Sequence, residues 1–487
     1  MMPGESVDMK YVFFGSLATL VLFVAAPAAA EAPATLWTQT FGGSDWDSGE
    51  SVEQTADGSF VQLGYTKSFG AGNYDFWLIK TDADGKEIWS RTFGGSGYDR
   101  GYSLEKTADG GFILLGETQS YGAGSADFWL IKTDSEGNEI WNQTFGGTEI
   151  DKGYSVQQTT DGGYVLLGDT KSFGTGYDLW VIRVDGDGNE LWSKAFGGSE
   201  DDRGRSVQET TGGGFALLGE TKSYGSGTSN FWLIKIDSAG TKLWDKTFAG
   251  TGFCVEETSD GGLILLGSRR DDICLIKTDG WGIEVWTKIF GGSDPDHGYS
   301  VQETSKGGYI LLGDTVSYGA GSTDLWLIET DAAGNELWNK TFGGTDTDFS
   351  SSVRQTEDGG FILVGKTSSF GAGDRDSWLI RLEGEEAPIV RPAISFPSLM
   401  VDQAMSDVTF LFMGEGAYST SSVVFDGRDV SNFVARVGIR GGLEDGGEYI
   451  RIPSLPAAKL GLGVHVLMFT IDDASETLTI TVVDGTE

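Results

Sequence analysis

The hydrophobic and polar positions along most of the chain form short apolar runs, each closed by a cluster of Gly, Asp, Asn or Ser. In the first repeating stretch the runs cover Glu50–Thr55, Phe60–Thr66, Asp75–Thr81 and Glu87–Phe93. Runs of this length bounded by turn residues predict β-strands. The second and third runs are almost continuously apolar, which predicts strands that are buried on both faces.

This group of four runs occurs seven times, and each copy opens with a Phe. The opening residues are separated by 52, 52, 51, 52, 42 and 52 positions and are Phe41, Phe93, Phe145, Phe196, Phe248, Phe290 and Phe342. A period near fifty with four short strands per copy predicts blades packed face to face around a ring. We therefore predict an all-β fold whose main domain, residues 36–384, is a seven-bladed β-propeller.

The two ends of the repeat array predict how the ring closes. The last copy ends after its third strand, Ser377–Leu382, whereas Leu36–Phe41 reads as a fourth strand with no first three before it. A closed ring accounts for this split, because the N-terminal strand then completes the last blade.

Residues 1–32 predict a secretory signal peptide. From Met9 the chain has one Lys, an apolar run and then small residues suited to cleavage near Ala30 or Ala32. The run Tyr11–Ala30 is also long enough to span a bilayer, so an uncleaved anchor remains the alternative. No second apolar segment of this kind follows, and we expect a secreted, extracellular or cell-surface protein with no membrane span after signal removal.

The repeat ends before residue 385, and residues 385–392 contain Pro388 and Pro392, which predicts a stiff linker. Residues 393–487 alternate as β-strands do. Within them, Val424–Val430 and Gly463–Thr470 resemble the later strands of an immunoglobulin-like adhesion module. The resemblance implies a C-terminal β-sandwich that serves as a spacer or docking unit.

The charge of the chain limits its partners. With 72 acidic and 34 basic residues, the net charge is −38, which repels phosphate backbones and excludes nucleic acid as a partner. Two Cys and two His exclude a disulfide scaffold and a His-rich metal centre. Cys254 and Cys274 fall on strands two spacings apart, about 9.6 Å, beyond the reach of a disulfide at about 7 Å, so two free thiols are favoured over a bridge. We expect a monomer.

Three motifs resemble known propeller families. Asp84–Trp89 and Asp187–Trp192 resemble the tryptophan-docking repeat of quinoprotein-type propellers, whose dehydrogenases have eight blades, a calcium-bound quinone and often a vicinal Cys pair. The full unit, with FGG, DGGY, LLGET and SFGAG, resembles the repeats of secreted bacterial and archaeal propeller proteins. The motif Asp-x-Gly-x-Ser, Asp99–Ser103 in the second copy, resembles in part the Asp-box of sialidase-type propellers. These resemblances imply the fold and leave the activity open.

The fifth copy lacks ten residues, four before its first strand and six between its second and third strands. In an up-and-down blade both connections lie at the same end of the strands, which we call the long-loop face. The deletions therefore predict a notch in this face over the fifth blade.

Two sets of residues recur on the long-loop face in every blade except the fifth. They are the acids Asp47, Asp99, Asp151, Asp202, Asp296 and Asp348, and the aromatics Phe69, Tyr121, Phe173, Tyr224, Tyr318 and Phe370. They could form a sugar-binding face with rings for stacking. We favour a structural role, in which each Asp caps loop N–H groups and each ring packs on the neighbouring blade.

Ligand contacts are expected instead at positions that differ between the copies. The residues flanking the repeated Asp qualify, and the predicted ligand-binding set is Trp46, Tyr98, Arg100, Lys152, Arg203 and His297. This aromatic and basic set stands out in an acidic protein. The alternative is a variable, solvated rim.

The turns between third and fourth strands contain pairs of carboxylates, Asp82 with Asp84 and Asp185 with Asp187. The spacing resembles the first half of a calcium loop, although the later ligands of such a loop do not follow. We favour plain hairpin turns and predict no cofactor, with calcium binding at these four residues as the alternative.

We predict an extracellular, non-enzymatic binding or surface protein that recognises a glycan or a cell-surface protein on its long-loop face. The alternative is a carbohydrate-active or degenerate quinoprotein-type enzyme; the sequence has no GxSxG, HExxH or phosphate-loop motif. Acidic and basic side chains converging in a deep central pocket would favour the enzyme. A shallow face with variable aromatics would favour the binding protein.

Overall fold

The computed structural model describes residues 31–226 and 229–384, together with the strands of residues 399–483. The chain divides into two units, residues 1–385 and 386–487. The predicted signal peptide and linker lie outside the described residues, and the predicted domain boundaries stay predictions. In the part of the chain that the structure describes, no helix is long and apolar enough to cross a membrane.

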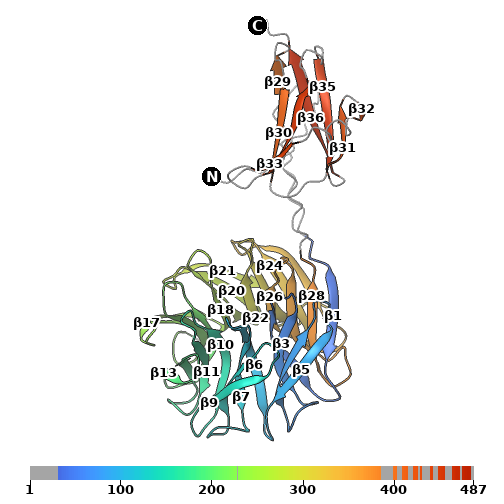
Figure 1. Cartoon of the computed structure of the whole chain (residues 1–487). Coiled ribbons are helices and arrows are strands. Elements are labelled where there is room, and N and C mark those ends of the chain that lie inside the picture. Colours follow the sequence, from blue (N-terminus) through green and yellow to red (C-terminus); the bar gives the residue numbers. More distant parts are fainter. Residues whose placement is uncertain are drawn as a thin grey trace. The chain divides into compact units, whose positions relative to one another are not determined.

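The first unit consists of seven four-stranded antiparallel sheets, the blades of a β-propeller (Figure 1). Blade one consists of β2 (Asp47–Gln54), β3 (Phe60–Thr66), β4 (Asp75–Thr81) and β5 (Glu87–Phe93); blade two of β6 (Asp99–Lys106), β7 (Phe112–Thr118), β8 (Asp127–Thr133) and β9 (Glu139–Phe145); and blade three of β10 (Asp151–Gln158), β11 (Tyr164–Thr170), β12 (Asp178–Val184) and β13 (Glu190–Phe196). Blade four consists of β14 (Asp202–Glu209), β15 (Phe215–Thr221), β16 (Asn230–Ile236) and β17 (Lys242–Ala249), and blade five of β18 (Thr251–Glu257), β19 (Leu263–Arg269), β20 (Asp272–Thr278) and β21 (Glu284–Phe290). Blade six consists of β22 (Asp296–Glu303), β23 (Tyr309–Thr315), β24 (Asp324–Thr330) and β25 (Glu336–Phe342), and blade seven of β26 (Asp348–Gln355), β27 (Phe361–Thr367), β28 (Asp376–Leu382) and β1 (Thr35–Phe41).

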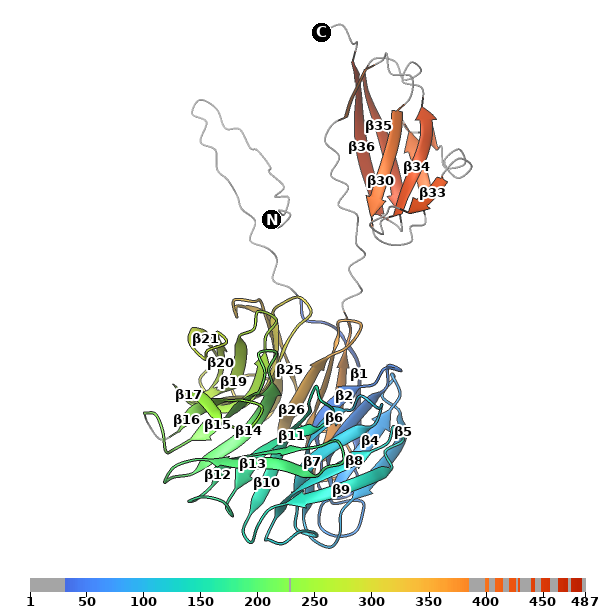
Figure 2. The same ribbon diagram turned by 60° about the vertical axis from the view of Figure 1, so that its left-hand side comes forward.

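The N-terminal strand β1 closes the ring. It pairs antiparallel with β28, with Thr40 opposite Trp378, and so becomes the outer strand of the seventh blade. The predicted seven blades, four strands per blade and N-terminal closure are confirmed. The first strands of neighbouring blades contact one another and surround the centre of the ring, while the fourth strands lie at its periphery (Figure 2).

Neighbouring blades are joined by a tryptophan that docks under a glycine. Trp37 of β1 packs edge-on against Phe60 of the next blade, with ring centroids 5.8 Å apart, and its Nε1 donates to the Ala83 carbonyl at 3.0 Å. At Gly85, where φ is +80°, a Cβ would lie 2.8 Å from the Trp37 ring. The same contact recurs in the pairs Trp89 with Gly137, Trp141 with Gly188, Trp192 with Gly240, Trp244 with Gly282 and Trp286 with Gly334.

The second and third strands of each blade are buried on both faces, as their apolar runs predicted. Between the first two blades, Leu63 and Phe76 of one sheet pack against Leu104 and Leu114 of the next. Full burial of one such side chain contributes about 1.5–3 kcal/mol. Since every blade buries its faces against two neighbours, no blade has a complete core by itself.

The inner strands are also linked around the ring by side chains that accept backbone N–H groups of the next blade. Glu105 accepts from the Gln158 N–H, and Glu256 accepts from the Glu303 N–H at 2.7 Å. Gln302 accepts from the Gln355 N–H in the same way, at 2.6 Å. These side chains line a cavity of about 390 Å³ at the end of the channel opposite the long-loop face. Burial raises the pKa of Glu105 and of Glu256 to about 7.

The second unit contains two sheets. One has the order β29 (Leu399–Asp402), β36 (Ala474–Val483), β35 (Gly463–Ile471), β31 (Thr420–Phe425) and β32 (Arg428–Asp429), and the other has β30 (Val408–Gly414), β34 (Glu448–Leu455) and β33 (Ile439–Gly442). The predicted strands of this segment are present. Its assignment as an immunoglobulin-like module stays a prediction.

The tryptophan–glycine docking predicts that Gly137→Ala is more destabilising than Gly110→Ala. Both glycines have positive φ, +75° and +85°, but a Cβ at Gly137 would meet Trp89 at 2.6 Å, whereas a Cβ at Gly110 meets nothing within 4 Å. The backbone strain costs about 1–2 kcal/mol at either site, and the clash adds about 1–3 kcal/mol at Gly137. Urea unfolding of the two variants measures the difference, and equal losses would contradict the docking role.

The buried carboxyl groups of Glu105 and Glu256 predict that stability falls as the pH rises from about 4.5 to 7. In this window the folded state holds protons that the unfolded state has released, because the folded pKa is the higher one. Three other blades have Gln at this position, namely Gln157, Gln208 and Gln302. We therefore expect the double variant Glu105→Gln, Glu256→Gln to show a shallower decline and a higher thermal midpoint at pH 8.

The exposed residue Glu136 provides the control. Glu136→Gln removes one carboxylate, as each channel substitution does, but lies outside the channel. We therefore expect it to leave the pH dependence of stability unchanged. A double variant whose thermal midpoint declines with pH as steeply as the parent's would rule out this role for the two channel carboxyls.

Candidate functional site

The fifth blade has the shortened connections that the sequence predicts. Only Gly250 separates β17 from β18, and β19 turns into β20 through Arg270 and Asp271, which have φ of 55° and 68°. The first blade uses residues 42–46 and 67–74 for these connections. The long-loop face is therefore reduced over blade five.

The repeated Asp residues have a structural role. Asp99 is fully buried, and its Oδ2 accepts from the Gly95 N–H at 2.9 Å and from the Ser120 hydroxyl at 2.6 Å. Its Oδ1 accepts from the Gln119 N–H at 3.2 Å. One carboxylate thus ties the loop before the first strand to the loop after the second, and the other five are equally buried.

The repeated loop aromatics pack on their own blade, so the prediction that they pack on the neighbouring blade was wrong. Tyr121 lies 5.1 Å from Trp129 of the same blade, and its hydroxyl donates to the Gly94 carbonyl at 3.0 Å. Blade five has neither partner, because Cys274 stands where the other blades have the third-strand Trp. Blade five lacks both the loop aromatic and the third-strand Trp, because in the other blades each of these side chains covers the other.

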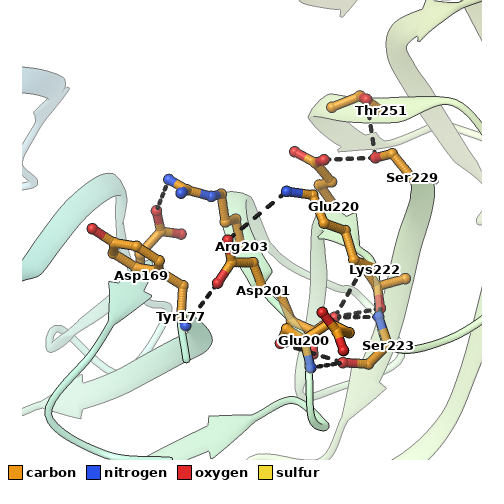
Figure 3. A network of polar contacts seen from close by, with 12 residues as sticks. Asp169, Tyr177, Glu200, Asp201, Arg203, Glu220, Lys222, Ser223, Ser229 and Thr251 are labelled. Carbon is orange, nitrogen blue, oxygen red and sulfur yellow. Dashed lines mark hydrogen bonds and ion pairs between the residues drawn. The ribbon is translucent and has the colours of Figure 1, made fainter. Parts of the chain in front are cut away.

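The structure brings three of the six predicted ligand-binding residues into one charged chain. The Nη1 of Arg100 lies 3.7 Å from Glu117, and the Nζ of Lys152 lies 2.8 Å from the same carboxylate. Arg203 reaches Asp169, the cross-strand neighbour of Lys152, at 3.3 Å (Figure 3). Both carboxylates lie on second strands and are buried.

Of the other three predicted residues, Tyr98 adjoins this group, with the Arg100 guanidinium 5.5 Å from its ring, whereas Trp46 and His297 belong to other blades. Trp46 and Tyr98 are 42% and 38% exposed. The Arg375 guanidinium stacks 4.6 Å from the Trp46 ring, and Tyr98 lies 5.6 Å from Tyr74. The Nδ1 of His297 is 3.1 Å from the Ser268 hydroxyl in blades six and five.

The sequence analysis missed a ring of seven residues at the centre of the long-loop face. Every first strand has a register irregularity near its start, between a Gly or Ser and a Ser or Cys two positions later. Such a β-bulge leaves one residue unpaired and re-aims its side chain. The seven bulge residues are Glu50, Tyr102, Tyr154, Arg205, Phe253, Tyr299 and Ser351, all half-buried.

These side chains line a central cavity of about 500 Å³, which we call the central funnel. Its wall also includes Asp314, Phe349, Ser350, Lys366 and Arg375. A cavity of this volume, with aromatic walls and a few polar groups, has the size of a small-molecule site.

Five of the bulge residues form a continuous stacked arc. The rings of Tyr102 and Tyr154 are 5.3 Å apart, and those of Phe253 and Tyr299 are 5.2 Å apart. Between the two pairs, the Arg205 guanidinium lies 4.6 Å from the Tyr154 ring and 6.0 Å from the Phe253 ring. Burial raises the pKa of Tyr154 to about 12, so the hydroxyl stays protonated at neutral pH.

The arc is interrupted by a polar segment from blades seven and one. The Ser351 hydroxyl donates to Glu50 at 3.2 Å, and the Lys366 ammonium donates to the same carboxylate at 3.0 Å. Nearby, Asp314 accepts from the Ser350 N–H at 2.6 Å and from its hydroxyl at 2.7 Å. Burial raises the pKa of Asp314 to about 7, well above the usual range of a carboxyl group.

A signal for the missed ring is present in the motif Asp-x-Gly-x-Ser. The second variable position, which is Tyr102 in the second blade, is the bulge residue. The Gly before it and the Ser after it recur in most blades, whereas the two variable positions of the motif differ between blades. The predicted set took the first variable position, occupied by Arg100, Lys152 and Arg203, and so missed the funnel wall.

In each of these hairpin turns the first carboxylate of the pair accepts hydrogen bonds from the turn's own backbone. The Asp82 Oδ1 accepts from the Asp84 N–H at 3.1 Å and from the Lys86 N–H at 2.9 Å, and Asp185 makes the matching bonds with Asp187. Among the described residues, no group of three or more His, Cys, Asp or Glu is arranged to hold a metal ion. Calcium binding at these turns stays a prediction.

Cys254 and Cys274 are both free thiols, as the strand spacing predicted. Cys254 packs with the core between blades five and six, whereas Cys274 belongs to the core between blades four and five. They point to opposite faces of one sheet.

A comparison of the sequence with protein families and with curated proteins gave no match. Several solved structures have a similar fold. A protein of unknown function from Bacteroides caccae is 13% identical with a TM-score of 0.39, covering 60% of this chain and 96% of its own. A putative gluconolactonase is 12% identical with a TM-score of 0.36, covering 58% and 88%. A puromycin hydrolase mutant is 10% identical with a TM-score of 0.45, covering 87% and 58%. These similarities concern the fold and carry no argument about function.

Proposed function

We propose that this is an extracellular binding protein that holds a glycan in the central funnel. The observation that carries the proposal is the stacked arc of Tyr102, Tyr154, Arg205, Phe253 and Tyr299, presented by β-bulges in a cavity of about 500 Å³. Half-buried rings offer flat apolar faces, and the arc leaves a polar gap at Glu50 and Ser351 for hydroxyl groups.

The fixed positions of the charged groups support binding over catalysis. Glu50 is held by Lys366 and Ser351, and Glu117 is held by the Tyr102 hydroxyl at 2.8 Å. Charged groups with partners already in place fix the shape of the wall. A funnel of this volume fits a short saccharide, whereas a protein partner needs a larger and flatter surface.

The rim residues of the predicted set extend this site. Trp46 and Tyr98 lie at the edge of the long-loop face with exposed rings. We propose that they contact parts of a glycan that project from the funnel. Secretion, the proposed setting, rests on the predicted signal peptide and on the net charge of −38, which keeps an extracellular protein soluble.

A carbohydrate-active enzyme is the second candidate, and Asp314 is the observation that favours it. A carboxyl group with a pKa of about 7 can donate and accept a proton at neutral pH. Its neighbours in the funnel include the Tyr299 side chain, which hydrogen-bonds with it, and Lys366. Perturbed carboxyl groups of this kind are concentrated at catalytic sites.

The glycan proposal predicts specific hits on a glycan array for the mature protein, screened with and without calcium. We expect Tyr154→Ala and Phe253→Ala to weaken the best hit about tenfold, equivalent to about 1.4 kcal/mol, through loss of stacking. Trp46→Ala and Tyr98→Ala are expected to have smaller effects. Trp281→Ala, which removes a 72% exposed ring from the opposite end of blade five, is the matched control and leaves affinity unchanged.

The absence of any glycan hit would contradict the proposal. Catalysis is tested on the same glycans by following cleavage products over time. Turnover that is lost in Asp314→Asn, while binding persists, would establish the enzyme instead, because Asn keeps the acceptor for Ser350 and loses the titrating proton.

A further inference from the structure

We infer that the ligand of the central funnel is an anionic saccharide, one that bears carboxylate or sulfate groups. This rests on the proposed glycan binding. The observation that carries it is a local surplus of positive charge around the funnel of a protein whose net charge is −38. The surplus arises because two buried carboxylates are each shared by two cations, and a further guanidinium has no carboxylate partner.

The first shared carboxylate is Glu117, which is 1% exposed. Arg100 and Lys152 approach it from two successive blades, at 3.7 Å and 2.8 Å. The ammonium of Lys152 thus bridges the blades. One negative charge balances two positive ones, so this group, which joins the funnel wall through the Tyr102 hydroxyl on Glu117, retains about one positive charge.

The second shared carboxylate is Asp169, which is fully buried. Arg203 pairs with it at 3.3 Å, and the Gly204 N–H donates to it at 3.0 Å. Arg205, the member of the stacked arc, is the other cation whose charge stabilises the Asp169 anion. Counted alone, this group of three retains about one positive charge, and Glu220 is a further carboxylate whose charge acts on Arg205.

The unpaired guanidinium belongs to Arg375, in the funnel wall. It lies between the Trp46 ring at 4.6 Å and the Phe349 ring at 5.0 Å. Within residues 31–226 and 229–384 it has no ion pair, and its buried Nε has no hydrogen-bond partner. Aromatic rings hold this cation in place without neutralising it.

A set of cations at the other end of the ring is paired one to one. On third strands, at the end opposite the long-loop face, five cations each pair with one aspartate. These pairs are Lys80 with Asp57, Lys132 with Asp109, Arg183 with Asp161, Lys277 with Asp260 and Arg381 with Asp358. One-to-one pairs fit a structural role. Glu53 at that end is also shared by two cations, Lys106 and Arg354. What distinguishes the funnel is that Arg375 in its wall has neither an ion pair nor a hydrogen-bond partner for its Nε among the described residues, which leaves a ligand to supply the negative charge.

The chemistry of these groups favours acids carried on sugar rings. A planar guanidinium matches carboxylate and sulfate oxygens with two parallel hydrogen bonds. The stacked arc takes the ring face, as in the proposed function. A polyanion such as nucleic acid is repelled by the surrounding acidic surface, whereas a short acidic saccharide places its few charges inside the funnel.

The test is binding of matched pairs of glycans that differ only in charge. The probes are a uronic acid trisaccharide with its methyl ester, and a sulfated disaccharide with its desulfated form, measured by calorimetry at low and high salt. We expect at least one acidic member to bind about tenfold or more tightly than its neutral partner, with the difference shrinking at high salt. The two pairs distinguish carboxylate from sulfate recognition.

Variants connect the preference to the funnel. Arg375→Gln is expected to lower affinity for the acidic member about tenfold and to leave the neutral member unchanged, while Arg375→Lys restores part of the preference. Lys194→Gln removes an exposed outer-strand cation and serves as the charge-matched control. An unchanged thermal midpoint confirms that the variants are folded.

Three outcomes would overturn the inference. Equal binding of acidic and neutral members would leave glycan binding intact and remove the anionic preference. An equal loss for both members in Arg375→Gln would show that Arg375 only shapes the wall. Binding of neither member of either pair, together with an empty glycan array, would overturn the inference and the proposed function together.

Discussion

The structure depends on the docking of one blade against the next. A sheet whose middle strands are buried on both faces must be covered on both sides. At six of the seven interfaces the indole of an outer strand completes that cover under a glycine of the following blade. Gly85 over Trp37 shows why neither residue can vary freely, since a Cβ would lie 2.8 Å from the ring. Six of the seven interfaces use this contact among the described residues, and at the remaining one Trp338 packs against Phe361 with ring centroids 6.1 Å apart. The ring is therefore stable only as a whole, and β1 must return to the seventh blade.

Blade five shows which positions are released from this constraint. It has lost the loop aromatic and the third-strand Trp that cover each other in other blades, and Cys274 fills the space. It keeps Gly282 over Trp244 and supplies Trp286 to the next blade. The long-loop face can therefore erode locally, whereas the contacts between blades cannot. Function is expected where the packing leaves freedom.

The fold was predictable because its constraint acts on every repeat. The period, the two-sided apolar strands and the isolated strand Leu36–Phe41 each report the packing of whole blades. The funnel was less predictable because a β-bulge breaks the alternation by which strand patterns are read. Tyr102 and Arg205 are also about a hundred positions apart, and only ring closure places them around one cavity. Arg100 and Lys152 were identified, but their shared partner Glu117 looks like an ordinary strand residue in the sequence.

The bulge resolves how a symmetric ring can carry an asymmetric site. Its backbone geometry recurs in all seven blades, while its side chain faces the funnel and takes no part in the tryptophan–glycine docking between blades. Five blades use that freedom for the stacked arc, and the two blades that meet at the chain closure supply Ser351 and Glu50 instead. A ligand in the funnel therefore meets stacking groups over most of its circumference and polar groups at one side. In the proposed complex, the polar segment of Glu50 and Ser351 sets the orientation of the ligand, and the cations around the funnel favour a ligand with negative charge.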